Sequence, residues 1–343
     1  MSLKILRKEA VAVLVEPLAA DYTVVGPQAR GSKFVFDPLS DPEQLRLDYD
    51  TTILPPKKVF QPQRERLATF TRGDDPVVET VVEVRPTVLL GMHTCDLHAL
   101  NLLDRAFSED YPDAHYLMRR QQTLIVSLDC LEACDDESFC RNMGTLTVDD
   151  GFDLHLTDLG DAYAVEIGTG AGEELLANYS EVRDATDAET SHRLQLQRSR
   201  LTDFADRLDP ESGELPSLLG QAYDHPHWDE LEERCFACGS CTNVCPTCYC
   251  FNVVDEVNLA LTEGARIRHW DSCQLDEFAR VAGGESFREG RGARQRHRFM
   301  RKGKYLFEKF GALGCVGCGR CIRTCPASIS ILEGFNKIHA SLR

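Results

Sequence analysis

The sequence has no long apolar run and no surplus of positive charge. No apolar stretch approaches the ~20 residues that a helix needs to cross a bilayer, and the longest, such as residues 87–92, have the length of a strand. Lysine and arginine number 38 against 55 aspartate and glutamate residues, a net charge of −17. These absences argue against a membrane-spanning protein and against general binding to nucleic acid or anionic membranes, which needs a basic surface.

Motifs for nucleotides are missing as well. There is no G-x-x-x-x-G-K-[ST] segment. Gly168, Gly170 and Gly172 lack the spacing of a dinucleotide-binding loop, so we interpret them as a turn. No Ser-His-Asp triad and no catalytic pair of carboxylates is recognisable. The sequence therefore carries no visible motif of its own for NAD, flavin or hydrolytic chemistry.

The N-terminal segment also lacks the features of a signal peptide. Charges interrupt its apolar stretch, and no small-residue cleavage site follows. We expect residues 1–20 to form an amphipathic helix and the chain to be cytoplasmic. Thiols stay reduced in the cytoplasm, so the 15 cysteines predict metal binding or redox chemistry rather than disulfides.

Most cysteines lie in a repeated pattern. None precedes Cys95 and none lies in residues 141–234, whereas the pattern Cys-x2-Cys-Gly-x-Cys-x3-Cys-Pro begins at both Cys235 and Cys315. In two-cluster ferredoxins, the fourth cysteine of each such run binds the other cluster. A zinc ribbon, the main alternative for a lone Cys-x2-Cys pair, does not explain the third cysteine and the terminal Cys-Pro.

We therefore predict two [4Fe-4S] clusters that share ligands between the two runs. The first would be bound by Cys235, Cys238, Cys241 and Cys325, and the second by Cys315, Cys318, Cys321 and Cys245.

A second group of cysteines lies in the N-terminal half of the chain. Apolar strands are expected at residues 87–92 and 123–128, and each leads into a cysteine-bearing loop at its carboxyl end. In α/β sheets, ligands usually bind at the carboxyl ends of the strands. The spacing matches no general motif, so a further cluster and buried structural cysteines both stay open. His93 and His98 are expected to be hydrogen-bonded neighbours, although histidine can replace cysteine in such sites. The four cysteines are Cys95, Cys130, Cys134 and Cys140.

Three cysteines and one basic segment belong to neither group. Cys248, Cys250 and Cys273 are expected to pack in the core beneath the clusters, with a partial metal site or a redox-active set as alternatives. The basic segment, residues 288–304, has three open interpretations. It is a solvated helix face, an offset to the negative charge of the clusters, or a docking surface for an acidic partner.

The order of expected elements predicts two domains. Residues 1–225 should form an α/β domain with one probable [4Fe-4S] site. Residues 226–343 should form a mostly α-helical, ferredoxin-like domain for two clusters, with a long insert at 246–314. Residues 209–228, which are rich in proline and glycine, are expected to be a linker. Expected elements of the first domain include a helix at 96–107, capped by Asp96, and a hairpin at 152–168.

Several segments together resemble the β subunit of cytoplasmic NAD(P)-linked [NiFe] hydrogenases, also called sulfhydrogenases. The anaerobic sulfite reductase A subunit is related to that family. The resemblance runs from about residue 20 to about residue 330. Its segments include LDYDTTILPPKKVFQP, GMHTCDLHALNLLDRAF, YLMRRQQTLIVSLDC, SFCRNMGT, CTNVCPTCYCFNV and WDSC.

The resemblance implies an electron-transfer subunit with no catalytic residue of its own. Its partners would be the small and large subunits of a [NiFe] hydrogenase and a subunit that binds FAD and NAD(P). The alternative is the electron-transfer subunit of an anaerobic sulfite reductase or a related sulfur-linked complex. Two other classes stay open: an iron–sulfur enzyme with Cys248, Cys250 and Cys273 as active thiols, and a binding module with structural clusters.

The resemblance also favours a third [4Fe-4S] cluster in the N-terminal domain. The family's N-terminal cysteines fall on Cys95, Cys130 and Cys140. The family often has Cys-Phe-Cys where this chain has Ser138-Phe139-Cys140. Cys134, four residues before Ser138, is then the candidate for the fourth ligand.

Overall fold

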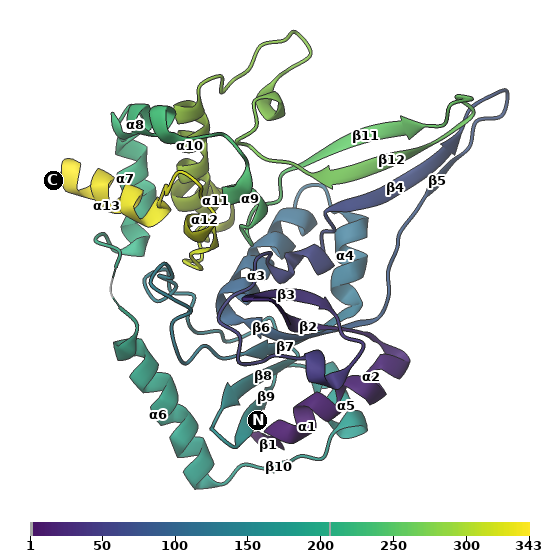
Figure 1. The fold of residues 1–343 in the computed structure, drawn as a ribbon, viewed down its shortest axis with the longest axis vertical. Helices are drawn as coiled ribbons and strands as arrows, with labels where there is room; N and C mark the ends of the chain where they lie inside the picture. Colours follow the sequence, from purple (N-terminus) through teal and green to yellow (C-terminus); the bar gives the residue numbers. More distant parts are fainter. Residues whose placement is uncertain (1–2, 206) are drawn as a thin grey trace.

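The N-terminal part of the chain is built on one mixed sheet of eight strands (Figure 1). The structure is a computed structural model that describes residues 3–205 and 207–343. The strand order is β10-β1-β9-β8-β7-β6-β2-β3, in which β2, β6, β7 and β8 are parallel neighbours and the outer pairs are antiparallel. The strands are β1 (Lys4–Arg7), β2 (Thr23–Arg30), β3 (Lys33–Pro38), β6 (Thr87–His93), β7 (Thr123–Leu128), β8 (Leu154–Asp158), β9 (Ala162–Ile167) and β10 (Arg183–Asp184).

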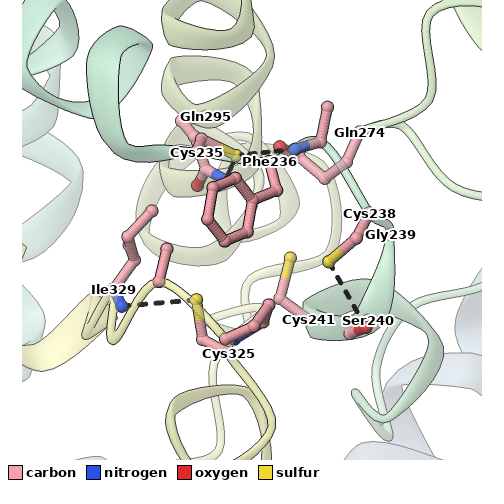
Figure 2. A pocket seen from close by; sticks show the side chains of 13 residues that line it. Cys235, Phe236, Cys238, Gly239, Ser240, Cys241, Gln274, Gln295, Cys325 and Ile329 are labelled. Carbon is pink, nitrogen blue, oxygen red and sulfur yellow. Dashed lines mark hydrogen bonds between the residues drawn. The ribbon is translucent and has the colours of Figure 1, made fainter.

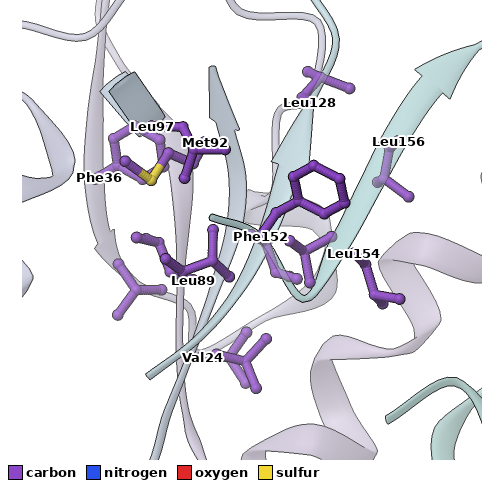
Figure 3. Packing of buried hydrophobic residues seen from close by; sticks show 14 of the residues in the cluster. Val24, Phe36, Leu89, Met92, Leu97, Leu128, Phe152, Leu154 and Leu156 are labelled. Carbon is purple, nitrogen blue, oxygen red and sulfur yellow. The ribbon is translucent and has the colours of Figure 1, made fainter. Parts of the chain in front are cut away.

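The centre of this sheet is covered by helices. β6 is buried at every position, as expected for a parallel strand with both faces covered. Figure 3 shows Leu89 and Met92 of β6 packed among side chains of neighbouring elements, including Phe36 and Leu97. The helices are α1 (Lys8–Val13), α2 (Val15–Asp21), α3 (Thr94–Ser108), α4 (Ala114–Gln121), α5 (Gly170–Tyr179) and α6 (Asp187–Asp203). The expected hairpin at 152–168 is formed by β8 and β9.

A second sheet of four strands projects from the body as an arm (Figure 1). It joins two distant parts of the sequence, since β4 (Arg64–Thr71) and β5 (Val78–Thr80) pair with the hairpin of β11 (Phe251–Val257) and β12 (Glu263–Trp270). At the base of the arm, Arg268 Nε lies 2.6 Å from Glu65 Oε1, and Arg119 of α4 pairs with the same carboxylate at 2.5 Å. This buried network fixes the arm to α4.

The C-terminal part packs short helices around a second apolar core. Phe299 lies at its centre, with ring centroids 5.4 Å from Trp228 and 5.5 Å from Phe335. The helices are α7 (Leu215–Gln221), α8 (His227–Arg234), α9 (Ser240–Asn243), α10 (Arg291–Met300), α11 (Leu306–Phe310), α12 (Arg320–Arg323) and α13 (Ile331–Ser341). A π-helical turn, Arg301–Tyr305, joins α10 to α11. Short 3-10 turns occur at Pro42–Gln44, Pro56–Val59, Ser212–Glu214 and Glu277–Ala279.

The structure corrects four local expectations. Residues Lys4–Arg7 are a strand rather than helix, because Ile5 and Leu6 are buried where β1 pairs with β9. α3 begins at Thr94 with His93 as its cap residue, since the Asp96 carboxylate binds Arg320 instead. The predicted linker at 209–228 contains α7 and the start of α8, and Leu215 and Leu219 of α7 are fully buried. The C-terminal part, expected to be mostly α-helical, also contains the strands β11 and β12.

Candidate metal centre

The two cysteine runs fold into the same local structure. In each run a residue with positive φ, Ala237 (53°) or Gly317 (69°), precedes the second cysteine. A left-handed glycine, Gly239 or Gly319, then opens a short helix, α9 or α12. These conformations turn the backbone so that three thiols face one side of the loop.

The first cavity is lined by thiols from both runs (Figure 2). Three come from the first run, Cys235, Cys238 and Cys241, and the fourth is Cys325 of the second run. Backbone and side-chain amides point at two of the sulfurs. Gln295 Nε2 donates to Cys235 Sγ at 3.0 Å, and Ile329 N donates to Cys325 Sγ at 3.3 Å. Amide donors of this kind stabilise cluster thiolates and tune the potential of an iron–sulfur cluster.

The second cavity is arranged in the same way. Its thiols are Cys315, Cys318 and Cys321 of the second run and Cys245 of the first, together with Cys241, which lines both cavities. Each cavity is thus lined by thiols of both runs, and the two cavities adjoin at Cys241. Within residues 3–205 and 207–343, no three His, Cys, Asp or Glu side chains are arranged to hold a single metal ion. The thiols instead line the walls of cavities.

Burial raises the pKa of four of these thiols, Cys241, Cys315, Cys318 and Cys321. It raises the pKa of Cys241 and of Cys318 to about 12. Cys245 is the opposite case, because a hydrogen bond from Cys248 and the nearby Lys302 ammonium lower its pKa despite burial. Binding of metal to the four thiols with raised pKa therefore has to release protons, so the affinity for metal should rise with pH.

Three buried cations near the thiols have no carboxylate partner among the described residues. Lys57, Arg298 and Lys302 are each at most 5% exposed, and the ion pairs found among the described residues include none of them. Burial disfavours the charge of Lys302, but the Cys245 and Cys248 sulfurs nevertheless hold its pKa above the ordinary value. Burial lowers the pKa of Lys57 to about 8, against the opposing effect of Cys248. Half-buried Arg301 has its pKa raised by Tyr249 and nearby sulfurs despite the opposing effect of burial.

These cations match the charge of two iron–sulfur cubes. A cube with a 2+ core and four thiolates carries about −2 when oxidised, so two cubes carry about −4, against four cations. Buried charges are normally paired, and Arg298 in addition has a buried Nη2 with no hydrogen-bond partner in the structure. Arg298 and Lys302 line the second cavity. The donor set and the charge therefore fit the binding of two cubes, which would supply one-electron redox chemistry.

A turn of π-helix brings part of this charge to the thiols. The basic segment at 288–304 forms α10 and most of the turn Arg301–Tyr305. Such turns are often found at functional sites. Lys302 Nζ reaches Thr247 Oγ1 at 2.5 Å, close to Cys245. Two residues of this segment, Arg298 and Lys302, therefore lie where cations that offset cluster charge would be needed.

The N-terminal cysteines converge beside the second cavity. Cys95 lies in the first turn of α3, directly after β6, and Cys130 follows the adjacent parallel strand β7. Thr94 Oγ1 lies 3.8 Å from Cys130 Sγ. Cys95, Cys130 and Cys140 share one apolar cluster with Cys318 of the second cavity. Cys134 lies near Cys140 and Cys130, and burial raises its pKa to about 11.

Hydrogen bonds hold this loop against the second cysteine run. Phe139 N donates to Gly317 O at 2.7 Å, and Thr145 Oγ1 donates to Val316 O at 2.7 Å. Arg320 binds Asp96 through two contacts of 2.6 and 2.7 Å. Sequence reasoning missed this contact because the two residues are distant in the chain, and it interpreted Asp96 as a helix cap.

The two histidines near Cys95 have other contacts. The His93 ring stacks on Tyr49, with centroids 4.1 Å apart, and burial lowers its pKa to about 4. His98 Nε2 lies 2.6 Å from Thr147 O. Ser138, at the position where a cysteine is often found, donates its hydroxyl to Asp135 O at 2.8 Å.

Comparisons with known proteins agree with the thiol-lined cavities. The 4Fe-4S dicluster domain family matches residues 234–329. The chain is 35% identical over 320 residues, which is 93% of both chains, to the sulfhydrogenase 2 subunit beta of Pyrococcus furiosus. No solved structure matches the chain. None of the helices in the described ranges combines the length and apolarity that a membrane span requires. The C-terminal part is therefore a ferredoxin-like 4Fe-4S dicluster domain, and the chain belongs to the family of the sulfhydrogenase β subunit.

Proposed function

We propose that this chain is the electron-transfer iron–sulfur subunit of a hydrogenase complex. It relays electrons between a [NiFe] module and a subunit that binds FAD and NAD(P). The observation that carries the proposal is the row of adjoining thiol sites. The first cavity shares Cys241 with the second, and Cys318 of the second packs against the N-terminal thiols. Electron transfer needs such close spacing of redox centres.

The proposed ligands follow from this grouping. The first cluster takes Cys235, Cys238, Cys241 and Cys325, and the second takes Cys315, Cys318, Cys321 and Cys245. Cys241 is assigned to the first cluster because the second cavity already has four other thiols.

A third [4Fe-4S] cluster is proposed at Cys95, Cys130, Cys134 and Cys140. Cys134 is preferred to Ser138 as the fourth ligand, because the Ser138 hydroxyl is engaged with a backbone carbonyl. Arg323 lies near Cys134 and Cys318 and pairs with Asp135. The third cluster would extend the row of redox centres from the dicluster domain to the carboxyl ends of β6 and β7 in the eight-stranded sheet.

Iron content and spectroscopy of the anaerobically purified chain test this proposal. We expect about 12 iron and 12 sulfide per chain and electron paramagnetic resonance (EPR) signals from three reduced clusters. C130S should lose about 4 iron and one signal, and C134S should do the same. The variant C134S/S138C tests whether a thiol at position 138 restores the fourth ligand.

Two results would contradict the proposal. About 8 iron, unchanged in C130S, would leave the dicluster relay intact but remove the third cluster. Oxidation of H2 or NAD(P)H by the isolated chain with intact clusters would contradict a relay role. The positive test of the relay is reduction of all clusters by H2 only when the [NiFe] module is added.

A further inference from the structure

Three thiols at the base of the β11–β12 hairpin are not needed by the proposed clusters. Cys250 directly precedes β11, and its carbonyl accepts a hydrogen bond from Asp271 N at 3.0 Å. Cys273 lies two residues after Asp271, in the segment that follows β12. Neither Cys248, Cys250 nor Cys273 lines either cavity.

The thiols of Cys250 and Cys273 are partners of each other. The two thiols lie close enough for each to shift the pKa of the other, and both are free rather than disulfide-bonded. Gln274 Nε2 also lies 3.4 Å from Cys273 Sγ. Cys248 is different, because its neighbouring thiol is Cys245, a proposed cluster ligand. The paired strands therefore hold one pair of thiols in contact, free of the proposed ligand sets.

This pair lies next to the proposed clusters. Cys273 is close enough to Cys241 for the two sulfurs to interact electrostatically, and Cys241 lines both cavities. Lys302 is near Cys273 and Cys245 alike. The thiol pair is thus close to a proposed cluster ligand, Cys241.

The charge balance argues against a further cluster at this place. Lys57, Arg298, Arg301 and Lys302 already match the roughly −4 of two oxidised cubes. A further set of buried thiolates beside Cys273 would need cations in addition to these four. A pair that cycles between two neutral states, dithiol and disulfide, adds no net charge.

We propose that Cys250 and Cys273 form a redox-active dithiol that exchanges two electrons with the adjacent iron–sulfur clusters. In oxidation, both S–H bonds break and one S–S bond forms. Two protons leave, and two [4Fe-4S] clusters are each reduced by one electron. Reduction reverses every step. The inference rests on the proposed function, since the clusters are the electron acceptors.

Burial makes the clusters the natural route for these electrons. Cys273 is only 3% exposed, which hinders direct thiol exchange with a dissolved disulfide, since exchange requires access. Cys250 is half-buried, so we assign the exit of protons to its side. The pair would let the chain match a two-electron donor to one-electron carriers.

The wild-type holoprotein tests the inference directly. It is equilibrated anaerobically at a series of potentials, denatured in acid, alkylated with N-ethylmaleimide at neutral pH, and analysed by peptide mass spectrometry. We expect Cys250 and Cys273 to lose alkylation together as the potential rises, with a linked peptide that is 2 Da lighter than the sum of the two thiol peptides. Cys248 should remain alkylated. Full alkylation of both residues at every potential would overturn the inference.

Electron counting gives a second, independent readout. Reductive titration of C250S should take up two electrons fewer than the wild type, with iron content and EPR signals unchanged, and C273S should match it. The matched control C248S should keep the two additional electrons. Loss of about four iron in C250S or C273S would make these residues cluster ligands and overturn the inference.

The two proposals can fail separately. Intact cluster signals with no disulfide at any potential would reject the dithiol and leave the electron-transfer function in place. A chain without iron–sulfur signals at any potential would reject both.

Discussion

At the scale of single residues, the centre is defined by positive charges that face sulfur instead of carboxylate. Lys302 is the clearest case, since it is 5% exposed and lies beside Cys245 and Cys248. A buried cation next to a cluster favours the reduced state, because reduction adds negative charge. The potential of the second cluster should therefore depend on this side chain.

Replacing Lys302 with methionine should lower the reduction potential of the second cluster. For unit charges about 6 Å apart at an effective dielectric constant of about 20, the interaction is about 3 kcal/mol, a shift on the order of 100 mV for one electron. EPR-monitored redox titration measures the shift. K304M is the control, because Lys304 pairs with Glu308 at the surface. Equal potentials in K302M and wild type would contradict the prediction.

A second residue-scale prediction concerns His297 and acid. Burial, with Arg288 and Arg301 nearby, lowers the pKa of His297 to about 4. The unfolded chain takes up this proton near pH 6.5, so the unfolded state binds more protons and stability falls as pH drops from about 6.5 to 4. H297Q should lose less stability than wild type over that range. Denaturant midpoints at several pH values measure the difference, with H192Q at the surface as the control. Parallel profiles for H297Q and wild type would refute it.

At the scale of elements, the cysteine loops could be predicted from the sequence, whereas the residues from distant parts of the chain that contact these loops could not. The spacing of thiols and glycines in the two runs is local, so the sequence carries the grouping that lines the cavities. Lys57 lies 191 positions before Cys248, whose carbonyl it binds, and no local pattern announces that contact. The strand β1 was missed for the same reason, since its pairing with β9 overrides the helical appearance of residues 1–20.

Gly317 shows how tightly the second loop fits against the N-terminal cysteines. A Cβ there would lie 2.6 Å from backbone atoms of Phe139 and Cys140, which cannot move aside easily. Gly311 has nearly the same φ, +68° against +69°, but an added Cβ would meet no atom within 4 Å. Alanine variants at the two positions therefore distinguish the cost of backbone strain, which both share, from the cost of the steric clash at Gly317.

G317A should be far more damaging than G311A. The left-handed conformation alone costs about 1–2 kcal/mol with alanine, which is the expected loss in G311A. The clash should raise the loss in G317A to about 4 kcal/mol or more and reduce the iron bound at the neighbouring sites. Denaturant unfolding and iron analysis measure both effects. Equal stabilities of the two variants would show that the contact is not tight.

At the scale of the whole molecule, the two predicted domains are joined by more than the chain between them. β4 pairs with β12, Arg268 pairs with Glu65, and Arg320 pairs with Asp96. The division at residue 225 remains a prediction from the sequence. Composition predicted a linker where α7 and the start of α8 lie, and it gave no sign that strands 64–71 and 263–270 form one sheet, because such pairing depends on the complete fold.

Cutting the chain near residue 223 should therefore not separate its parts. A protease site inserted between Tyr223 and Asp224, which are both exposed, should give two fragments that elute together. Breaking a buried ion pair costs about 3–5 kcal/mol, so R268M/R320M should release the fragments at lower denaturant. The surface variant R64M is the control. Size-exclusion chromatography measures the outcome, and fragments that separate without denaturant would refute it.

The pairing of β4 with β12 also sets an order of events during synthesis. β4 leaves the ribosome nearly two hundred residues before β12, a delay of roughly 10 to 40 s at the usual rates of translation. Throughout that interval the nascent chain carries an unpaired strand edge, which invites aggregation. The proposed first cluster waits longer still, since it requires Cys325. Iron insertion at the first site would therefore be a late step, which follows the synthesis of nearly the whole chain and the folding of its N-terminal part.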